Sequence, residues 1–324
     1  MRRSTAVLFF TAAAASVSAI QVDPSVLDAC PGYSATNIKT RNDGLTVDLV
    51  LLPKSLQCFW RWHPRFIIKC NLWNRYVCSF NLRYSKLQPK FVGDRIHLKI
   101  TDPSFTRYEV PESVLPRPKG KITTSAHSAA IQFNYTTSPF SFSISRASTH
   151  EVLFTTAGHP LIFERQYLRV KTKLPSNPNI YGLGEHSNPF HLPTDNTTLT
   201  LWARDANRIP TGTNLYGSHP VYFEHRNTGT HGVLLLNSDG MDIKLTKDGS
   251  GASALEYNVI GGILDFYFFA GSETDPTEVA RQYAEVAGLP AEVLSWSFGF
   301  HQCRLGYRST FYLSFSLSYL NLDF

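Results

Sequence analysis

The sequence has few cysteines, few methionines and no long hydrophobic run. Only five of its 324 residues are Cys and two are Met. An odd number of thiols cannot all pair within one chain, so at least one is left over. The apolar run 6–17 is shorter than the roughly 20 residues that a transmembrane helix needs. We therefore expect no membrane-spanning segment and no membrane partner.

The first 19 residues have the pattern of a secretory signal peptide. Arg2 and Arg3 form a basic start, an apolar core follows, and small residues at 17–19 offer a cleavage site. The mature chain would then begin at Ile20. The pattern predicts a secreted, extracellular protein.

Export would permit disulfides and N-linked glycans. Two sequons are present, one at Asn134 and one at Asn196. Unused sequons arise by chance, so that alternative stays open at both positions. Asn196 lies in a stretch rich in turn formers and is the better candidate glycosylation site.

Acidic residues are missing from one long segment, because residues 49–93 contain no Asp or Glu. The same segment holds eight basic residues: Lys54, Arg61, Arg65, Lys69, Arg75, Arg83, Lys86 and Lys90. Arg2 and Arg3 bring this to ten, and taking them from the formal charge of +6 leaves the rest about four charges negative. The basicity therefore belongs to one segment and not to the whole chain.

This anomalous segment, residues 50–93, also concentrates cysteine and tryptophan. It contains Cys58, Cys70, Cys78, Trp60, Trp62 and Trp73. A basic aromatic surface is typical of binding to nucleic acid or anionic polysaccharide. A zinc site using the three cysteines and His63 is a second hypothesis, although the spacing matches no familiar zinc pattern. The third is an unspliced intron or a shifted reading frame, because the composition breaks the pattern on both sides. We favour the third and expect no nucleic-acid partner.

Short alternating apolar and polar runs predict strands from residue 94 onward. Ile96, Leu98 and Ile100 alternate with polar residues, and Pro, Gly, Ser and Asn fill the turns between such runs. The further runs lie at 130–135, 140–145, 152–156, 161–171, 221–225, 232–236, 242–245 and 264–269. Many short strands at this spacing predict a mainly β fold, an antiparallel β-sandwich over residues 20–274.

One helix is predicted after the sandwich, at 275–287. Asp275 is a capping residue, Pro276 suits the first turn, and Glu278 stands at the capping-box position. Gly288 then ends the helix.

Two segments follow this helix. Residues 296–304 are predicted to form a buried strand followed by polar groups. Residues 310–324 alternate serine with aromatic residues and leucine, a composition that would favour aggregation if it were exposed. We interpret this tail as a second anomalous segment.

Residues 178–225 are the densest run of turn formers, aromatics and polar groups in the sequence. Gly182 and Gly184 allow positive φ angles around the turn, and 198–203 alternates as a short strand. Long loops held by strands often carry binding residues. Sugars suit such a surface, because aromatic faces stack on their C–H groups and carboxylates or amides bind their hydroxyls.

Four blocks of this run carry a family resemblance. They are YGLGEH at 181–186, PTDN at 193–196, WARDA at 202–206 and TGTNLYGSHPVYFEHR at 211–226. These blocks resemble glycoside hydrolase family 31, and within it the secreted fungal α-glucosidases. The resemblance implies a galactose-mutarotase-like sandwich, followed over 275–309 by a linker helix and the first strand of a (β/α)8 barrel. Active sites of such barrels lie at the C-terminal ends of the strands.

The resemblance also implies where the substrate is held. Retaining glycosidases use two carboxylates, and in this family both come from barrel strands downstream of Arg304, so this chain contains no catalytic residue. The resemblance implies that Asp205, Asn207, His301 and Arg304 bind substrate, with Asp205 on a sugar hydroxyl. Asp205 and Asn207 could instead stabilise a turn, and His301 could hydrogen-bond in a core. No metal and no organic cofactor is implied.

The chain also contains carboxylates that are local candidates for chemistry. These are Glu185, Asp195 and Asp205, and the alternative for Glu185 is a hydrogen-bonded carboxylate within its own turn. Nothing in the resemblance supports any of them as a nucleophile.

Three functions remain open. The first is an exported α-glucosidase that releases terminal, non-reducing α-linked glucose from α-glucans or maltooligosaccharides, with this chain as its inactive N-terminal part. The second is a non-catalytic carbohydrate-binding β-sandwich. The third is a mutarotase-like enzyme, which needs a His and a Glu in one cleft. On a strand, the adjacent Glu185 and His186 would point to opposite faces, which argues against the third.

Overall fold

The computed structural model describes residues 24–41, 44–53, 55, 84–92, 94–102, 106–118, 129–204, 209–301 and 309. The predicted signal peptide, the four residues of the zinc hypothesis and the tail 310–324 lie outside these residues, so those interpretations stay untested. The chain divides into two compact units, residues 1–287 and residues 288–324.

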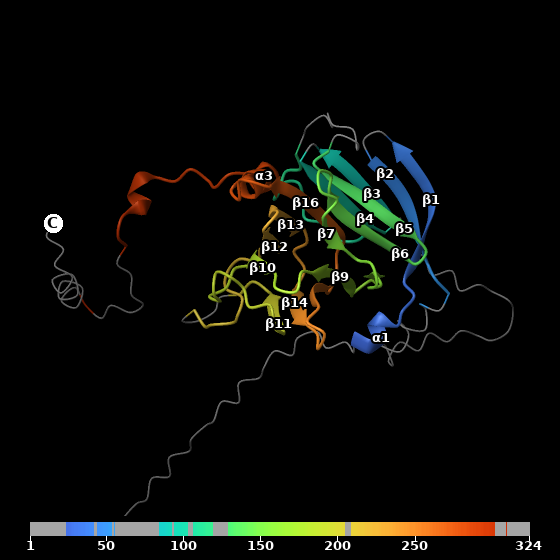
Figure 1. The fold of residues 1–324 in the computed structure, drawn as a ribbon. Helices are drawn as coiled ribbons and strands as arrows, with labels where there is room; N and C mark the ends of the chain where they lie inside the picture. The colour runs from blue at the N-terminus through green and yellow to red at the C-terminus, as the bar shows by residue number, and fades with distance from the viewer. Residues whose placement is uncertain are drawn as a thin grey trace, which may run out of the picture. The chain divides into compact units, whose positions relative to one another are not determined.

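The described strands of the first unit form three antiparallel sheets (Figure 1). The largest has eight strands in the order β1-β2-β3-β4-β16-β13-β12-β10. Their bounds are β1 Tyr33–Arg41, β2 Gly44–Leu51, β3 Tyr84–Val92, β4 Arg95–Thr101, β10 Asn179–Gly182, β12 Val221–Arg226, β13 Gly229–Leu235 and β16 Leu264–Ser272. The predicted antiparallel, mainly β architecture is confirmed.

The two smaller sheets enclose the core with the large one. The five-stranded sheet has the order β11-β14-β15-β9-β8, with bounds Thr197–Leu201, Met241–Lys247, Ser253–Val259, Leu168–Leu174 and Ile162–Phe163. The three-stranded sheet has β5 Ile131–Thr137, β6 Phe140–Arg146 and β7 Val152–Thr155. β5 contacts β1 and β4, so the small sheet lies against the first strands of the large one (Figure 1). One continuous hydrophobic cluster contains residues from all three sheets.

Part of the anomalous segment belongs to the large sheet. β3 pairs with β2 along one edge and with β4 along the other, both antiparallel. Lys86 lies opposite Asp48 on β2, and Lys90 lies opposite His97 on β4. Residues 84–92 therefore complete the sheet, although the composition of 50–93 set them apart from it.

Strand β4 shows why alternation predicted its position well. Ile96, Leu98 and Ile100 are fully buried in the core, while the side chains between them are less buried at 97 and 99. A period of two places alternate side chains on opposite faces of a strand, so one face of β4 fills the core. Burial of three aliphatic side chains contributes roughly 1.5–3 kcal/mol each to folding.

Strand β16 is buried on both faces. Phe266 and Phe268 enter the main core, whereas Tyr267 and Phe269 belong to a second hydrophobic cluster. Helix α3 (Glu278–Ala287) supplies Val279 and Val286 to that second cluster. The strand is apolar at successive positions, without polar alternation, because α3 covers the face of β16 that would otherwise be exposed to solvent.

Helix α3 confirms the helix that the capping residues predict. The Asp275 carboxylate accepts hydrogen bonds from the backbone N–H and the hydroxyl of Thr277, at 2.9 and 2.7 Å. Gln282, buried in the middle of the helix, exchanges two hydrogen bonds with the backbone of Gly271 on β16. Gly288 follows the helix with a φ of +88°. These contacts attach the helix to the sandwich.

Two short helices differ from the sequence expectation. Helix α1 (Pro24–Asp28) was not predicted, because five residues are too few to show a helical period.

In the second unit, Ser295–Phe298 form a 3-10 helix, η1, where we expected a buried strand from residue 296. The side chains of Trp296, Phe298 and Phe300 are 68–81% exposed. A strand of a parallel barrel pairs with a strand on each of its edges, but every strand pair in the described residues is antiparallel. The strand that we expected from residue 296 is therefore wrong up to residue 301. Residues 302–304 lie outside the described residues, and the barrel itself stays a prediction.

Within the described residues, no helix is both long and apolar enough to cross a membrane.

Candidate functional site

A tight turn follows β10 at residues 182–186. Gly182 has a φ of +105°, and a Cβ there would lie 2.5 Å from the carbonyl oxygen of Val221, so only glycine fits. Leu183 is fully buried, and its N–H donates to the same carbonyl oxygen at 2.8 Å. These contacts hold the turn against Val221, the first residue of β12.

Glu185 forms hydrogen bonds with backbone groups of the loop before β12. Its Oε2 accepts the backbone N–H of Gly217 at 2.7 Å, and its own N–H donates to the Gly217 carbonyl at 3.0 Å. Asn214 Nδ2 donates to the carbonyl oxygens of Glu185 and Gly217, at 2.8 and 2.7 Å. The Ser218 hydroxyl donates to Asn214 Oδ1 at 2.8 Å. This geometry agrees with a carboxylate that stabilises its turn and does not favour Glu185 as a nucleophile.

His186 does not form a catalytic pair with Glu185. Its Nδ1 accepts the N–H of Asn188 at 3.2 Å, and its Nε2 lies 3.1 Å from the carbonyl oxygen of Gly182. Because Nδ1 accepts, the tautomer with the proton on Nε2 satisfies both contacts. The two side chains are each engaged by different backbone groups, so the mutarotase-like hypothesis gains no support from them.

The loops hold both ends of the segment that carries Asp205 and Asn207. On one side, the N–H of Arg204 donates to the Leu215 carbonyl at 2.8 Å. On the other side, the carbonyl of Pro210 accepts the hydroxyl of Ser187 at 3.2 Å. The ends of 205–208 are therefore fixed to the same network that includes Glu185.

The four predicted substrate contacts divide between two places. Asp205 and Asn207 lie outside the described residues, between the fixed ends, and Arg304 also lies outside them. His301 belongs to the second compact unit, where its Nε2 lies 3.1 Å from the carbonyl oxygen of Ser297 and its ring contacts Trp296. Asp195 is exposed on the loop before β11. The assignment of substrate contacts stays a prediction.

The two sequons differ in their surroundings. Asn134 lies in the middle of β5, and its Nδ2 donates to the Ser145 hydroxyl at 3.3 Å. Asn196 is exposed in the loop just before β11 and has a φ of +50°. Both Asn residues are exposed and both sequons remain candidate glycosylation sites, but only Asn196 lies in a loop.

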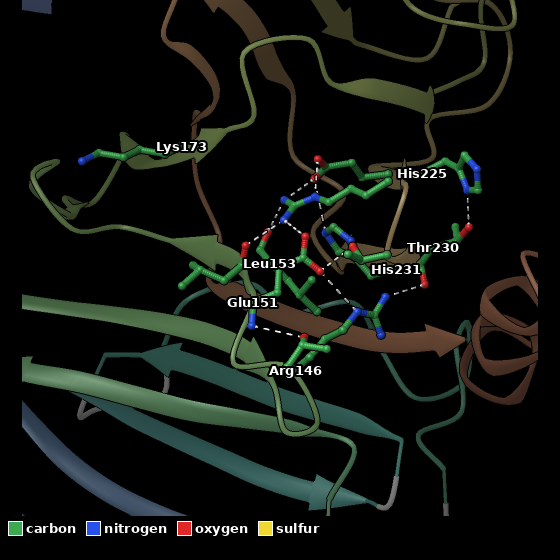
Figure 2. A network of polar contacts seen from close by, with 12 residues as sticks. Arg146, Glu151, Leu153, Lys173, His225, Thr230 and His231 are labelled. Atoms are coloured by element: carbon green, nitrogen blue, oxygen red, sulfur yellow. Dashed lines mark hydrogen bonds and ion pairs between the residues drawn. The ribbon is translucent and has the colours of Figure 1, made fainter. Parts of the chain in front are cut away.

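A buried cluster of charged groups was missed by sequence reasoning (Figure 2). Arg226 donates to both oxygens of Glu224, at 2.7 and 2.9 Å, and to Glu151 at 3.1 Å. Arg146 lies 3.6 Å from Glu151, and His231 lies 3.4 Å from Glu224. No sequence signal marks this cluster, since its members come from β6, β7, β12, β13 and the β6–β7 turn.

The electrostatics of this cluster indicate a structural role. Burial raises the pKa of Glu224, and burial together with Arg226 and Arg146 lowers the pKa of His231 well below its ordinary value. Perturbed pKa values often mark functional sites, but Glu224 is 0% exposed and His231 1% exposed. No substrate reaches such groups, so the cluster holds the small sheet to the large one.

The described residues contain no group of three or more His, Cys, Asp or Glu side chains that could hold a metal ion. They do contain a cleft of about 700 Å³ beside β11, lined among others by Trp202 and Asp239. In the sequence, Trp202 is part of a strand pattern and the first residue of the WARDA block, whereas no local pattern marks Asp239.

Comparison with known proteins identifies the domain. Residues 94–243 match the family described as the glycosyl hydrolase 31 N-terminal galactose mutarotase-like domain. The chain is 49% identical over 290 residues to a probable alpha/beta-glucosidase of Arthroderma benhamiae, covering 88% of this chain and 31% of that protein. It is 50% identical over 284 residues to the probable alpha/beta-glucosidase agdC of Aspergillus fumigatus, covering 87% and 30%.

More distant proteins share less of the sequence or only the fold. Alpha-xylosidase 1 of Arabidopsis thaliana is 43% identical over 235 residues, which cover 66% of this chain and 25% of that protein. The crystal structure of an ER glucosidase II heterodimeric complex superposes with a TM-score of 0.71 at 15% identity, covering 92% of this chain and 39% of the other. That likeness shows the fold alone.

The chain spans about three tenths of the length of the α/β-glucosidases that it matches. The matched region includes the turn at 182–186, the loop network around Glu185 and strand β11. Residues 94–243 are thus a glycosyl hydrolase 31 N-terminal galactose-mutarotase-like domain, and the chain is similar to the N-terminal portion of α/β-glucosidases.

Proposed function

We propose that this chain is the N-terminal part of a retaining α-glucosidase. The substrate would be the terminal, non-reducing α-linked glucose of an α-glucan or maltooligosaccharide. The observation that carries the proposal is the 49–50% identity to α/β-glucosidases over 87–88% of the chain. The loop network around Glu185 adds a physical role, because it fixes the ends of a segment that carries a carboxylate and an amide.

The role of this part is to position substrate. A retaining mechanism needs two carboxyl groups about 5–5.5 Å apart, one as nucleophile and one as acid and base. Glu185 already accepts a backbone N–H, and Asp205 lies outside the described residues. We assign Asp205 and Asn207 to hydrogen bonds with sugar hydroxyls, which orient the glucose without reacting with it.

The protein is proposed to be secreted. Cys30 is disulfide-bonded and 4% exposed. Disulfides persist in oxidising compartments and are rare in the cytosol. The predicted signal peptide and the exposed sequon at Asn196 support the same location. A glycan on Asn196 would make it a secreted glycoprotein.

A non-catalytic carbohydrate-binding sandwich is the alternative function. Helix α3 covers β16, and among the described residues the two hydrophobic clusters of the first unit include none beyond 287. A sandwich with such a core can present its loops to a sugar without a catalytic domain. This function predicts sugar binding without hydrolysis in every natural product of the gene.

The deciding experiment has two stages. The mature transcript is first sequenced across codons 50–94 and past codon 309, and its full product is assayed with maltose beside the present chain. The α-glucosidase proposal expects glucose release by the full product and none by this chain. An Asp205→Ala variant of the full product should lose about tenfold or more in kcat/KM, since one hydrogen bond to a charged group contributes roughly 1.5–3 kcal/mol.

A full product that binds maltose but never hydrolyses it would support the alternative. Turnover by the present chain, purified to homogeneity, would show that residues within it supply the chemistry and would overturn the proposal.

A further inference from the structure

The cleft beside β11 has the dimensions of a ligand site. Its volume is about 700 Å³, within the roughly 300–1,000 Å³ of small-molecule pockets. Its walls come from the end of β11, from residues 218–220, from β13 and the loop after it, and from α3. All of these belong to the first compact unit.

Trp202 forms one wall of this cleft. Its side chain is 60% exposed, although it is the largest aromatic group near the cleft. The indole rests against the backbone of Gly240, where an added Cβ would lie 2.5 and 2.8 Å from two ring atoms. Glycine at 240 therefore provides the seat for the indole. A seated aromatic face that remains open can stack on an apolar surface of a ligand.

Asp239 stands next to that seat. Its backbone N–H donates to Asn237 Oδ1 at 2.7 Å, and the Asn237 amide donates to the carbonyls of Gly261 and Ile263. The carboxylate lies against Gly261 and Gly262, and its Oδ2 is buried with no hydrogen-bond partner among the described residues. Burial raises the pKa of Asp239. The scaffold thus holds a carboxylate that its own surroundings leave short of donors.

The remaining polar groups of the lining indicate the class of ligand. Ser218 and Ser238 offer hydroxyl groups and His219 offers ring nitrogens, and the described lining includes no Lys or Arg. A phosphate or carboxylate ligand would meet Asp239 without a cation to balance it. A wholly apolar ligand would bury that carboxylate without a donor, at a cost of about 1–3 kcal/mol. A neutral polyol with one apolar face satisfies both the indole and the carboxylate.

We propose that this cleft is a carbohydrate-binding site, in which Trp202 stacks on a glucosyl unit. Asp239 accepts a hydroxyl of that unit through Oδ1, because its Oδ2 is buried. All of the proposed contacts come from described residues of the first compact unit, and they require no catalytic domain. The proposal does not rest on hydrolysis, so it and the α-glucosidase proposal fail independently.

Maltotriose binding to the present chain, measured by isothermal titration calorimetry, tests this site. We expect saturable binding that Trp202→Ala and Asp239→Asn each weaken by about fivefold to tenfold, from the loss of one stacked ring or one charged hydrogen bond. Gly240→Ala keeps the indole but displaces it from its seat, and should weaken binding in the same direction. Phe190→Ala is the matched control, because Phe190 is an 85% exposed aromatic outside the cleft lining, and it should bind as the parent does.

A folding check makes the result decisive. Thermal unfolding followed by circular dichroism shows whether the variants fold, and if Trp202→Ala unfolds, Gly240→Ala and Asp239→Asn still test the site. The proposal is overturned if the parent chain shows no saturable binding, or if the three cleft variants bind as the parent does.

Discussion

The side-chain amide of Asn214 donates to the carbonyl oxygens of Glu185 and Gly217, and so joins the turn after β10 to the loop before β12. Asn214 is 6% exposed, so water cannot replace these bonds freely. Replacement by Ala leaves two carbonyl groups without this donor, and we expect a loss of roughly 1–3 kcal/mol in the free energy of unfolding. Urea unfolding of Asn214→Ala against the parent chain measures it.

A matched change in the same network separates the donor from the acceptor side of Asn214. Ser218→Ala removes one hydrogen bond to Asn214 Oδ1 and leaves both carbonyl contacts intact. The smaller loss, about 0.5–1.5 kcal/mol, is expected for Ser218→Ala. Equal losses in the two variants would show that the carbonyl contacts are not what holds the loops together.

Arg226 should be among the most sensitive positions for stability. It neutralises Glu224, which is 0% exposed, and it also contacts Glu151 and the carbonyls of Val152 and Leu153. Removing one partner of a buried ion pair typically costs about 3–5 kcal/mol, because the other charge stays buried. Arg226→Met should therefore lower the free energy of unfolding by that amount in chemical denaturation.

Arg281 supplies the matched surface control. It forms ion pairs with Glu278 and Glu285 on α3, but its side chain is 55% exposed. Exposed pairs contribute at most about 1 kcal/mol. If Arg281→Met and Arg226→Met cost the same, the distinction between a buried cluster and a surface pair does not hold in this protein.

The fold followed from the sequence where one rule dominated. Ile96, Leu98 and Ile100 alternate because one face of β4 is buried, and period two alone locates such a strand. Asp275 and Gly288 mark the ends of a helix by backbone chemistry that tertiary packing does not change. The strand expected at residue 296 failed because a run as short as 296–300 does not distinguish a strand from a single 3-10 turn by its period. Pairing partners, which sequence patterning does not show, decide between the two.

The candidate site was partly predictable for a similar reason. The run of loop residues around Gly182 marked the turn and Glu185, because glycine and turn formers carry a local signal. Asn214 bonds Glu185, 29 positions away, and Asn237, which accepts the N–H of Asp239, bonds Gly261 and Ile263, 24 and 26 positions away. No local pattern records such contacts. The Trp202 seat on Gly240 is a packing relationship of the same kind.

Acid should destabilise this domain partly through His159. Burial, followed by the charge of Lys171, lowers the pKa of His159 to about 4, against about 6.5 in an unfolded chain. Between these two pH values the unfolded state binds more protons than the folded state. The contribution of His159 is therefore intact above pH 6.5 and is lost as the pH falls towards 4.

The comparison that isolates this effect is the slope of unfolding free energy against pH in His159→Gln and in the parent. The variant should show a shallower fall between about pH 6.5 and 4. His231, whose pKa burial also lowers, remains in both proteins and supplies part of the residual slope. Identical slopes would mean that His159 titrates alike in the folded and unfolded chains.

Expression through a eukaryotic secretory pathway should place an N-linked glycan on Asn196 in preference to Asn134. Asn196 is exposed in a loop, while the Asn134 amide nitrogen, the atom that would carry the glycan, bonds Ser145 within a strand pair. A glycan on Asn134 leaves one N–H for that bond but has to extend from the middle of a strand pair, whereas one on Asn196 extends from a loop. Intact mass before and after enzymatic deglycosylation gives the occupancy, with Asn196→Gln and Asn134→Gln as paired variants. We expect the mass shift to fall sharply in Asn196→Gln and to change little in Asn134→Gln. The reverse pattern would show that modification precedes the pairing of β5 with β6, so that the folded environment of Asn134 does not protect it.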